Sequence, residues 1–433
     1  MITIFIEKRP YIGLFLLSLI LMSSLVGDGY NPKISSIEIY GNNETLDYVI
    51  EREIQHPLYN QLDSALADAD RNRLENLGIF SNVSWKAIPL QDETAILKFT
   101  VIESIQKTPP GAFPIYDDET GWSLTGGWII QNFRGRNQSL QLGGSFGGKD
   151  TYGFIFSDPW MIGNHVSFSI QMGRSLYLHN FLNREIDVHS LKISLGKWFG
   201  DHFKTSTGFE LEKKSFSSKD ITESFFYFSP DLSINYDTRD IFWNPGKGVL
   251  FSQYLYHAIG IEPADISLTV WHQSYSLFLK LNQSDNKLVL ALNGSIKRKM
   301  GDKKEVWLNY FGDSYTVRGW TLPNHDLYIN GNESFRFGHE SIFGSMELRK
   351  DIIPKYATKY GTEFGLGFVA FYDMGIISDD WKTLFEIKPM SGLGFGFRIP
   401  IPMVDVLRID YGWGYRNGQW NSGALHWGVQ QKF

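Results

Sequence analysis

The stretch Leu407-Arg408-Ile409-Asp410-Tyr411-Gly412-Trp413-Gly414 decides the fold class, because its residues alternate strictly between two kinds. Successive side chains of a β-strand point to opposite faces, so one face is aliphatic and aromatic while the other carries only glycine and charge. The same alternation recurs at 391–400, 362–376 and 286–299. A soluble sandwich would bury the apolar face as its core, whereas a membrane barrel would turn it toward lipid.

The composition excludes several classes of protein. The 433 residues contain no cysteine, which removes thiol catalysis, disulfides and cysteine-based zinc sites. The net charge of -6 does not suggest a nucleic-acid partner. Glycine (42 residues) and aromatic residues (15%) are both abundant. Membrane barrels share this composition, because their strands alternate lipid-facing apolar residues with small lumen residues. The composition therefore favours a transmembrane antiparallel β-barrel.

The N-terminus has the features of a targeting segment. Lys8 and Arg9 precede an apolar run over 11–26, and Gly27, Asp28 and Gly29 follow it. The run is short for a membrane-spanning helix, which needs about 20 apolar residues. A signal peptide over 1–27 is therefore preferred to a membrane-anchoring helix, and a mature protein in the bacterial outer membrane is expected.

Residues 33–104 predict a small α+β domain in the order β-α-α-β-β. Strands are expected over 33–42, 79–85 and 94–103, and helices over 44–55 and 64–77. The order, together with Leu74-x-x-Leu77-Gly78-x-Phe80-x-x-Val83, resembles a POTRA domain. The resemblance implies a periplasmic domain that captures clients or partners, for which an exposed sheet edge is suited. The alternative is a rigid spacer, and 105–118 is expected to be a linker.

Residues 119–433 predict the barrel. A single-chain bacterial barrel has an even number of strands, so sixteen are expected, with one strand or two short ones in 221–238. The others are expected near 121–131, 137–148, 150–157, 164–175, 186–198, 202–214, 247–258, 267–282, 286–299, 341–352, 362–376, 391–400, 403–416 and 423–433.

Short motifs inside the barrel resemble those of the BamA/TamA-like superfamily of outer-membrane assembly proteins. Each is weak alone, but their order and spacing together are specific. Asp158-Pro159-Trp160 resembles an outer connection of these barrels, and Val317-Arg318-Gly319-Trp320 resembles the tip of their sixth extracellular loop. The remaining matches are Asn132–Arg136, Asp237–Asp240, Phe371–Gly375 and the C-terminal signal strand His426-x-Gly428-x-x-Gln431-x-Phe433, in which Gln431 departs from the expected apolar residue.

The resemblance implies that the sixth loop folds back into the lumen, where Arg318 pairs with Asp373 and lies near Glu347. The alternation places both carboxylates on the lumen face independently of the resemblance, because Asp373 shares the face of Gly365 and Gly367. A buried ion pair contributes little net stability after desolvation. We therefore predict that Val317, Arg318, Gly319 and Trp320 form a latch whose role is positional.

No enzyme activity, cofactor or metal is predicted. Gly143-x-Ser145-x-Gly147 matches a hydrolase pattern that requires a strand-to-helix turn, but it lies within a predicted strand. The ten histidines show no paired metal-ligand spacing.

The predicted function is insertion or translocation of other outer-membrane proteins. The POTRA domain would capture the unfolded client and pass it to a seam between the first strand (121–131) and the last (423–433). The resemblance further implies contact with the lipid bilayer and with periplasmic or lipoprotein partners through the POTRA domain. Two alternatives remain open: a two-partner-type secretion pore for a dedicated protein, and a porin or surface antigen with no role in assembly.

Overall fold

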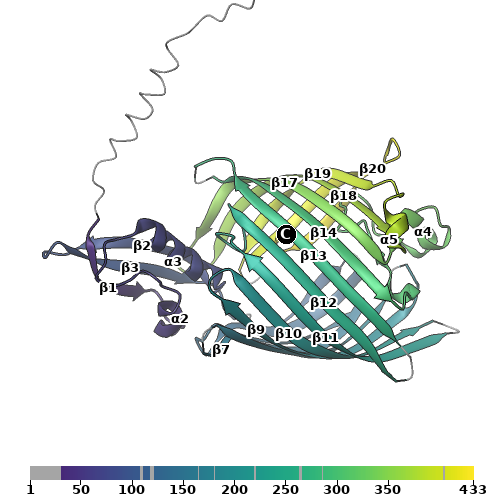
Figure 1. Ribbon diagram of the computed structural model, residues 1–433, viewed down its shortest axis with the longest axis horizontal. Coiled ribbons are helices and arrows are strands. Elements are labelled where there is room, and N and C mark those ends of the chain that lie inside the picture. The colour runs from purple at the N-terminus through teal and green to yellow at the C-terminus, as the bar shows by residue number, and fades with distance from the viewer. Residues whose placement is uncertain are drawn as a thin grey trace, which may run out of the picture.

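A computed structural model describes residues 31–107, 111–117, 121–163, 165–179, 181–218, 221–262, 266–284, 286–402 and 405–433. The predicted signal peptide lies outside these residues. A small α+β domain lies at one end of a β-barrel, and the helices α4 and α5 lie at the other (Figure 1). The two ends of the barrel are called the near end, beside the small domain, and the far end. No helix among the described residues is long and apolar enough to cross a membrane.

The small domain has the predicted order of elements. Its elements are β1 (Lys33–Tyr40), α2 (Asp47–Glu51), α3 (Ser64–Asn76), β2 (Phe80–Pro89) and β3 (Thr94–Glu103). The sheet order is β1-β3-β2, with β1 parallel and β2 antiparallel to β3.

Local chemistry and burial explain the helix and sheet of this domain. The Asp63 carboxylate accepts hydrogen bonds from the backbone N–H of Ala65 and Leu66, both at 3.0 Å, and so caps α3. Leu74 on α3 is fully buried in the same apolar core as Leu97 and Phe99 of β3. The helix is therefore held on the sheet by its apolar face.

Seventeen strands of the described residues form the barrel. They are β4 (Gly111–Asp117), β5 (Gly121–Phe133), β6 (Gln138–Gly147), β7 (Lys149–Ile162), β8 (Val166–Leu178), β9 (Glu185–Phe199), β10 (Phe203–Ser217), β11 (Thr222–Asp237), β12 (Gly248–Glu262), β13 (Ser267–Lys280), β14 (Leu288–Gly301), β17 (Glu340–Ala357), β18 (Glu363–Ser378), β19 (Met390–Ile401), β20 (Asp405–Arg416), β21 (Gln419–Trp420) and β22 (Ala424–Val429). Because β21 and β22 both pair with β20, they occupy one place, and the barrel has sixteen strand positions.

The strand order corrects the predicted seam. Each strand follows its sequence neighbour, and the order places β22 beside β4. The first strand of the barrel is therefore β4, within the expected linker, and not 121–131. Residues 222–237 form a single strand, so β4 supplies the sixteenth position. The last strand ends at Val429 and not at 433, because Gln430 adopts a φ of 63° and turns the chain out of the sheet.

A long connection between β14 and β17, residues 302–339, is called loop 6 here. It contains the 3-10 helix η1 (Glu305–Trp307), β15 (Asn309–Tyr310), α4 (His325–Ile329), the 3-10 helix η2 (Ser334–Arg336) and β16 (Phe337–Gly338). The short helix α5 (Trp381–Leu384) lies in the connection between β18 and β19.

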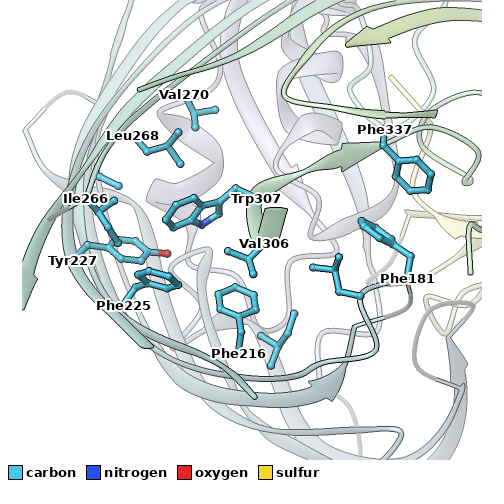
Figure 2. Packing of buried hydrophobic residues seen from close by; sticks show 13 residues of the cluster. Phe181, Phe216, Phe225, Tyr227, Ile266, Leu268, Val270, Val306, Trp307 and Phe337 are labelled. Carbon is cyan, nitrogen blue, oxygen red and sulfur yellow. The ribbon is translucent and has the colours of Figure 1, made fainter. Parts of the chain in front are cut away.

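An apolar cluster holds loop 6 against the wall of the barrel. Val306, Trp307 and Phe337 of loop 6 pack with Phe225 of β11 and Leu268 of β13, and all five side chains are buried (Figure 2). This set is called the apolar cluster. Its complete membership is Phe181, Leu182, Ile186, Phe216, Phe225, Tyr227, Ala258, Ile266, Leu268, Val270, Val306, Trp307 and Phe337.

The small domain contacts the near-end turns of the barrel. The amide of Gln55 donates to the Asp201 carboxylate (2.9 Å), and the amide of Asn76 donates to the carbonyl of Asp240 (3.1 Å). Between this domain and the wall lies a cavity of about 1080 Å³, called the vestibule, whose lining includes polar side chains of α3 and of β8 to β12. Asp158-Pro159-Trp160 is a near-end feature and not an outer connection, because Arg52 of the small domain stacks 4.2 Å from the centre of the Trp160 ring.

Candidate functional site

The tip of loop 6 is shaped by its own side chains. The Asp313 carboxylate accepts hydrogen bonds from the backbone N–H of Tyr315 (2.8 Å) and Thr316 (2.6 Å), which turns the chain tightly before Val317. Gly319 has a φ of +90°, a conformation that other residues avoid. Val317 is fully buried with Phe343 and Ile377. The turn and this contact present Arg318 to the lumen wall.

Arg318 is surrounded by three carboxylates from three different strands. Its Nε and Nη2 donate to Asp373 of β18 at 2.8 and 3.0 Å, and its backbone N–H donates to the same carboxylate at 3.1 Å. Its Nη1 lies 2.7 Å from Glu347 Oε1 of β17 and donates to Asp410 Oδ2 of β20 at 3.0 Å. All four side chains are fully buried, and the guanidinium lies 3.6 Å from the centre of the Phe371 ring.

Further cations surround the same carboxylates. Arg349 Nε lies 2.8 Å from Glu347, and Arg398 Nη1 lies 2.6 Å from Asp410. Arg408 donates to the carbonyl of Ser314 in loop 6 at 3.1 Å. Charged groups in a water-poor interior need partners of opposite charge, since an unpaired one costs several kcal/mol. The network therefore accepts the loop tip in one position and penalises its displacement.

A row of lumen-facing glycines provides the surface on which the tip rests. A Cβ atom on Gly392 would overlap the carbonyl oxygen of Arg318, and one on Gly414 would overlap the indole of Trp320. The Trp320 Nε1–H donates to the carbonyl of Ser391 at 2.8 Å. The Asn421 amide donates to the carbonyl of Gly319, also at 2.8 Å. The glycine face of β19 and β20 thus lets the loop backbone approach the wall closely.

The residues after β20 also contact the latch. His426 Nε2 accepts the backbone N–H of Gly319 at 2.9 Å, so β22 holds the tip directly. A Cβ on Gly428 would meet the Arg408 guanidinium at 2.5 Å. Lys432 Nζ lies 2.8 Å from Asp373 Oδ2 and also donates to the carbonyl of Thr316.

The end of the chain, residues 430–433, turns into the lumen, and we call it the tail. Gln431 lines a small cavity beside Arg349. Phe433 packs near Phe278 of β13, and its carbonyl accepts from Arg349 Nη2 at 3.2 Å. The alternation of the last strand predicted none of this, because Gln431 and Phe433 do not continue the strand.

The structure brings together most of the residues singled out from the sequence. Arg318 contacts both Asp373 and Glu347, the two carboxylates that the latch hypothesis named. The backbone N–H of Gly319 contacts the His426 ring. Sequence reasoning missed Asp410 as the third carboxylate, although Asp410 shares the glycine and charge face of its strand. It also missed Lys432, for which the sequence offers no local signal.

Sequence profiles of known families match almost the whole described chain. The Omp85 superfamily domain matches residues 132–433, and the surface antigen variable number repeat, a POTRA profile, matches residues 32–104. The chain belongs to the Omp85 superfamily. This Omp85 protein is therefore a bacterial outer-membrane protein with a β-barrel and a POTRA domain, as the motifs predicted.

Named relatives of this Omp85 protein are distant. It is 23% identical over 429 residues to the outer membrane protein assembly factor BamA of Nitratidesulfovibrio vulgaris, covering 92% of this chain and 51% of that protein. It is 28% identical over 138 residues to BamA of Neisseria meningitidis serogroup B, covering 31% of this chain and 17% of that protein. The chain thus spans about half the length of the first relative and much less of the second.

Solved structures share the fold. BamA from Haemophilus ducreyi lacking POTRA domains 1–3 superposes with a TM-score of 0.53 at 15% identity, covering 92% of this chain and 83% of that chain. CdiB from Acinetobacter baumannii superposes with a TM-score of 0.51 at 14% identity, covering 93% and 73%. At such identities the likeness concerns the fold alone.

Proposed function

We propose that this Omp85 protein inserts other outer-membrane proteins through the seam between β22 and β4. The observation that carries the proposal is the length of β22. This last strand has six residues, whereas β5 to β14 and β17 to β20 have 10 to 18. A short strand offers few ladder hydrogen bonds, so this junction is the easiest part of the wall to open to a client strand.

Loop 6 supports insertion through the wall more than passage through the lumen. Its tip is locked by the carboxylates of β17, β18 and β20, and its ends are packed in the apolar cluster at residues 306, 307 and 337. Both attachments would have to break before a chain could pass the far end. Opening the seam requires only that the short strand β22 separates from β4.

The POTRA domain is proposed to deliver the client. The strands β1 and β2 form the two edges of its sheet, and an exposed edge can pair with an extended segment. The domain also lies beside the vestibule, whose lining includes polar side chains that suit a hydrated, unfolded chain. Its contacts with the turns at Asp201 and Asp240 would keep a captured client close to the barrel.

A cross-link across the seam tests the proposal. The natural chain has no cysteine, so a Phe113→Cys, Trp427→Cys pair and neighbouring pairs in β4 and β22 can be screened for disulfide formation. The locked protein should lose insertion of client barrels, and reductant should restore it. The control is Phe395→Cys with Tyr411→Cys, which lie opposite each other in β19 and β20 and should leave insertion intact.

Depletion distinguishes the proposal from its alternatives. Depleting the protein and measuring the outer-membrane proteome should lower many barrel proteins if the role is assembly. Loss of one exported protein would instead indicate a dedicated secretion pore. An unchanged proteome would indicate a surface antigen or porin with no role in assembly.

A further inference from the structure

We propose that the outer surface of β6 to β10 binds a lipid through its phosphate group. The site is independent of the seam and of loop 6. Four residues lie side by side in register across β7, β8, β9 and β10: Tyr152 pairs with Arg174, Arg174 with His189, and His189 with Lys213. This row is called the polar row. It joins an aromatic hydroxyl and three basic side chains on one level of the wall.

An apolar row runs directly beside the polar row. It lies two residues nearer the POTRA domain on each strand and faces the same side of the sheet. Its members are Leu142, Phe154, Met172, Leu191 and Leu211, each opposite the next. The outer surface of these strands therefore changes from apolar to basic side chains over two residues along each strand.

Both rows lie on the outside of the barrel. Tyr152 is 57% exposed, Met172 is 48% exposed and Leu142 is 44% exposed. Glu212, which lies between Leu211 and Lys213 on β10, points the opposite way and accepts a hydrogen bond from Tyr227 of the apolar cluster. The exposed faces of the rows thus meet the membrane, and the polar row marks the level where hydrocarbon gives way to headgroups at the far end.

A groove lies between the two rows. Its volume is about 640 Å³, and its lining includes Tyr152, His189 and Lys213 on one side and Leu142, Met172 and Leu191 on the other. Its floor includes the backbone of Gly143, Gly153 and Gly173, which lie between the two rows. The groove has the shape and chemistry for one acyl chain whose headgroup reaches the basic residues.

Charge selects a phosphate as the headgroup. Lys213 is exposed and has no ion pair within the described part of the chain. Arg174 is held by the Asp187 carboxylate at 2.8 and 2.9 Å, and His189 Nε2 lies 3.4 Å from the same carboxylate. Asp187 thus pairs with Arg174 and also lies beside His189. Lys213, with the Tyr152 hydroxyl in the same row, remains free to contact an anionic oxygen.

Lipid binding to the purified full chain tests the site. The probes are phosphatidylglycerol, lipid A, and a diacylglycerol without phosphate, each titrated into the detergent-solubilised protein and measured by native mass spectrometry. Wild type should prefer a phosphate-bearing lipid to diacylglycerol. Lys213→Gln should weaken phosphate-lipid binding about fivefold, as expected for one cation at a membrane surface. The phosphate lipid that binds with the higher affinity identifies the class of lipid that the site takes.

Two matched variants keep the test decisive. Lys388→Gln removes another exposed far-end lysine, in the connection before β19, and should leave binding unchanged. Leu191→Trp fills the groove from the membrane side and should weaken the binding of diacylglycerol and phosphate lipid alike. Equal affinity of wild type for all three lipids, equal loss in Lys388→Gln, or unaltered binding by Lys213→Gln would overturn the proposal.

Discussion

Loop 6 is attached to the barrel at two places with opposite chemistry. Toward β17, β18 and β20 its tip is held by Arg318 among three buried carboxylates and rests on glycines. Toward β9 to β13 its two ends are held by apolar packing around Trp307 and Phe337. The first attachment depends on the orientation and charge of the interacting groups. The second depends on the apolar area that packing removes from water.

The difference indicates separate tasks for the two attachments. Apolar burial contributes about 25 cal/mol per Å² whatever the orientation, so the apolar cluster stabilises the loop but tolerates small shifts. A buried ion network contributes little net free energy, yet a broken one leaves charges unpaired. The network around Arg318 therefore defines where the tip lies, while the apolar cluster keeps the loop inside.

Removing the central carboxylate should have the largest effect. Asp373→Ala leaves Arg318, Lys432 and the Ser345 hydroxyl without their shared acceptor. Leaving buried charges unpaired costs about 3–5 kcal/mol, which a urea-unfolding curve of the detergent-solubilised protein would measure. The control Asp379→Ala removes a far-end carboxylate that is 73% accessible and contacts the His339 ring at 2.8 Å, and it should cost less than about 1 kcal/mol.

Truncating the apolar attachment should come next. Trp307→Ala should lower the free energy of unfolding by about 3 kcal/mol, because it empties a buried aromatic site. The Arg318 contacts should survive, so loop 6 should become protease-sensitive near η1 before it does near Val317. Phe385→Ala, at a 64% exposed residue, is the control; cleavage first at Val317 in Trp307→Ala would contradict the separation of tasks.

Crowding the glycine surface should have a smaller effect. Gly392→Ala places a methyl group against the Arg318 carbonyl, and overpacking of this kind costs about 1–3 kcal/mol. Gly294→Ala in β14 has no atom within 4 Å of the new Cβ and should be close to neutral. The two unfolding curves should therefore separate, and coincident curves would show that the tip does not need close approach to β19.

The tail should contribute least. Lys432→Met keeps the length of the side chain and removes its charge, while Arg318 continues to pair with Asp373. Asp373 keeps the Arg318 guanidinium and the Ser345 hydroxyl as donors, so no buried carboxylate is left unpaired and the free energy of unfolding should change by less than about 1 kcal/mol. The tail should become easier to digest with carboxypeptidase, and undiminished protection would show that Phe433 holds it alone.

The sequence predicted the fold class because alternation is a local property of each strand. It missed β4 because Pro114 cannot donate a ladder hydrogen bond and argues against an ordinary strand. A strand at the seam tolerates proline better than a central strand does, and Pro114 lies opposite Leu124 of β5.

The site was only partly predictable, for a physical reason. Alternation tells which face Asp373 and Asp410 occupy, but not how far each lies along the barrel axis. That position depends on the register of β18, β19 and β20, which brings Asp410 opposite Gly396 and Asp373 opposite Gly392. The inward turn of the tail follows from the attraction of Lys432 to a carboxylate 59 residues away, which no local pattern contains.

The most direct test of the latch is the position of the loop tip when Arg318 is lost. Spin labels at Thr321→Cys in loop 6 and Lys359→Cys in a near-end turn, both exposed positions, report the distance along the lumen by pulsed electron paramagnetic resonance. The account predicts one narrow distance in the otherwise natural protein and a broad distribution with Arg318→Ala. It also predicts intermediate broadening with Arg318→Lys, which keeps the charge but cannot bridge three carboxylates. The same narrow distance in all three proteins would contradict the claim that Arg318 positions loop 6.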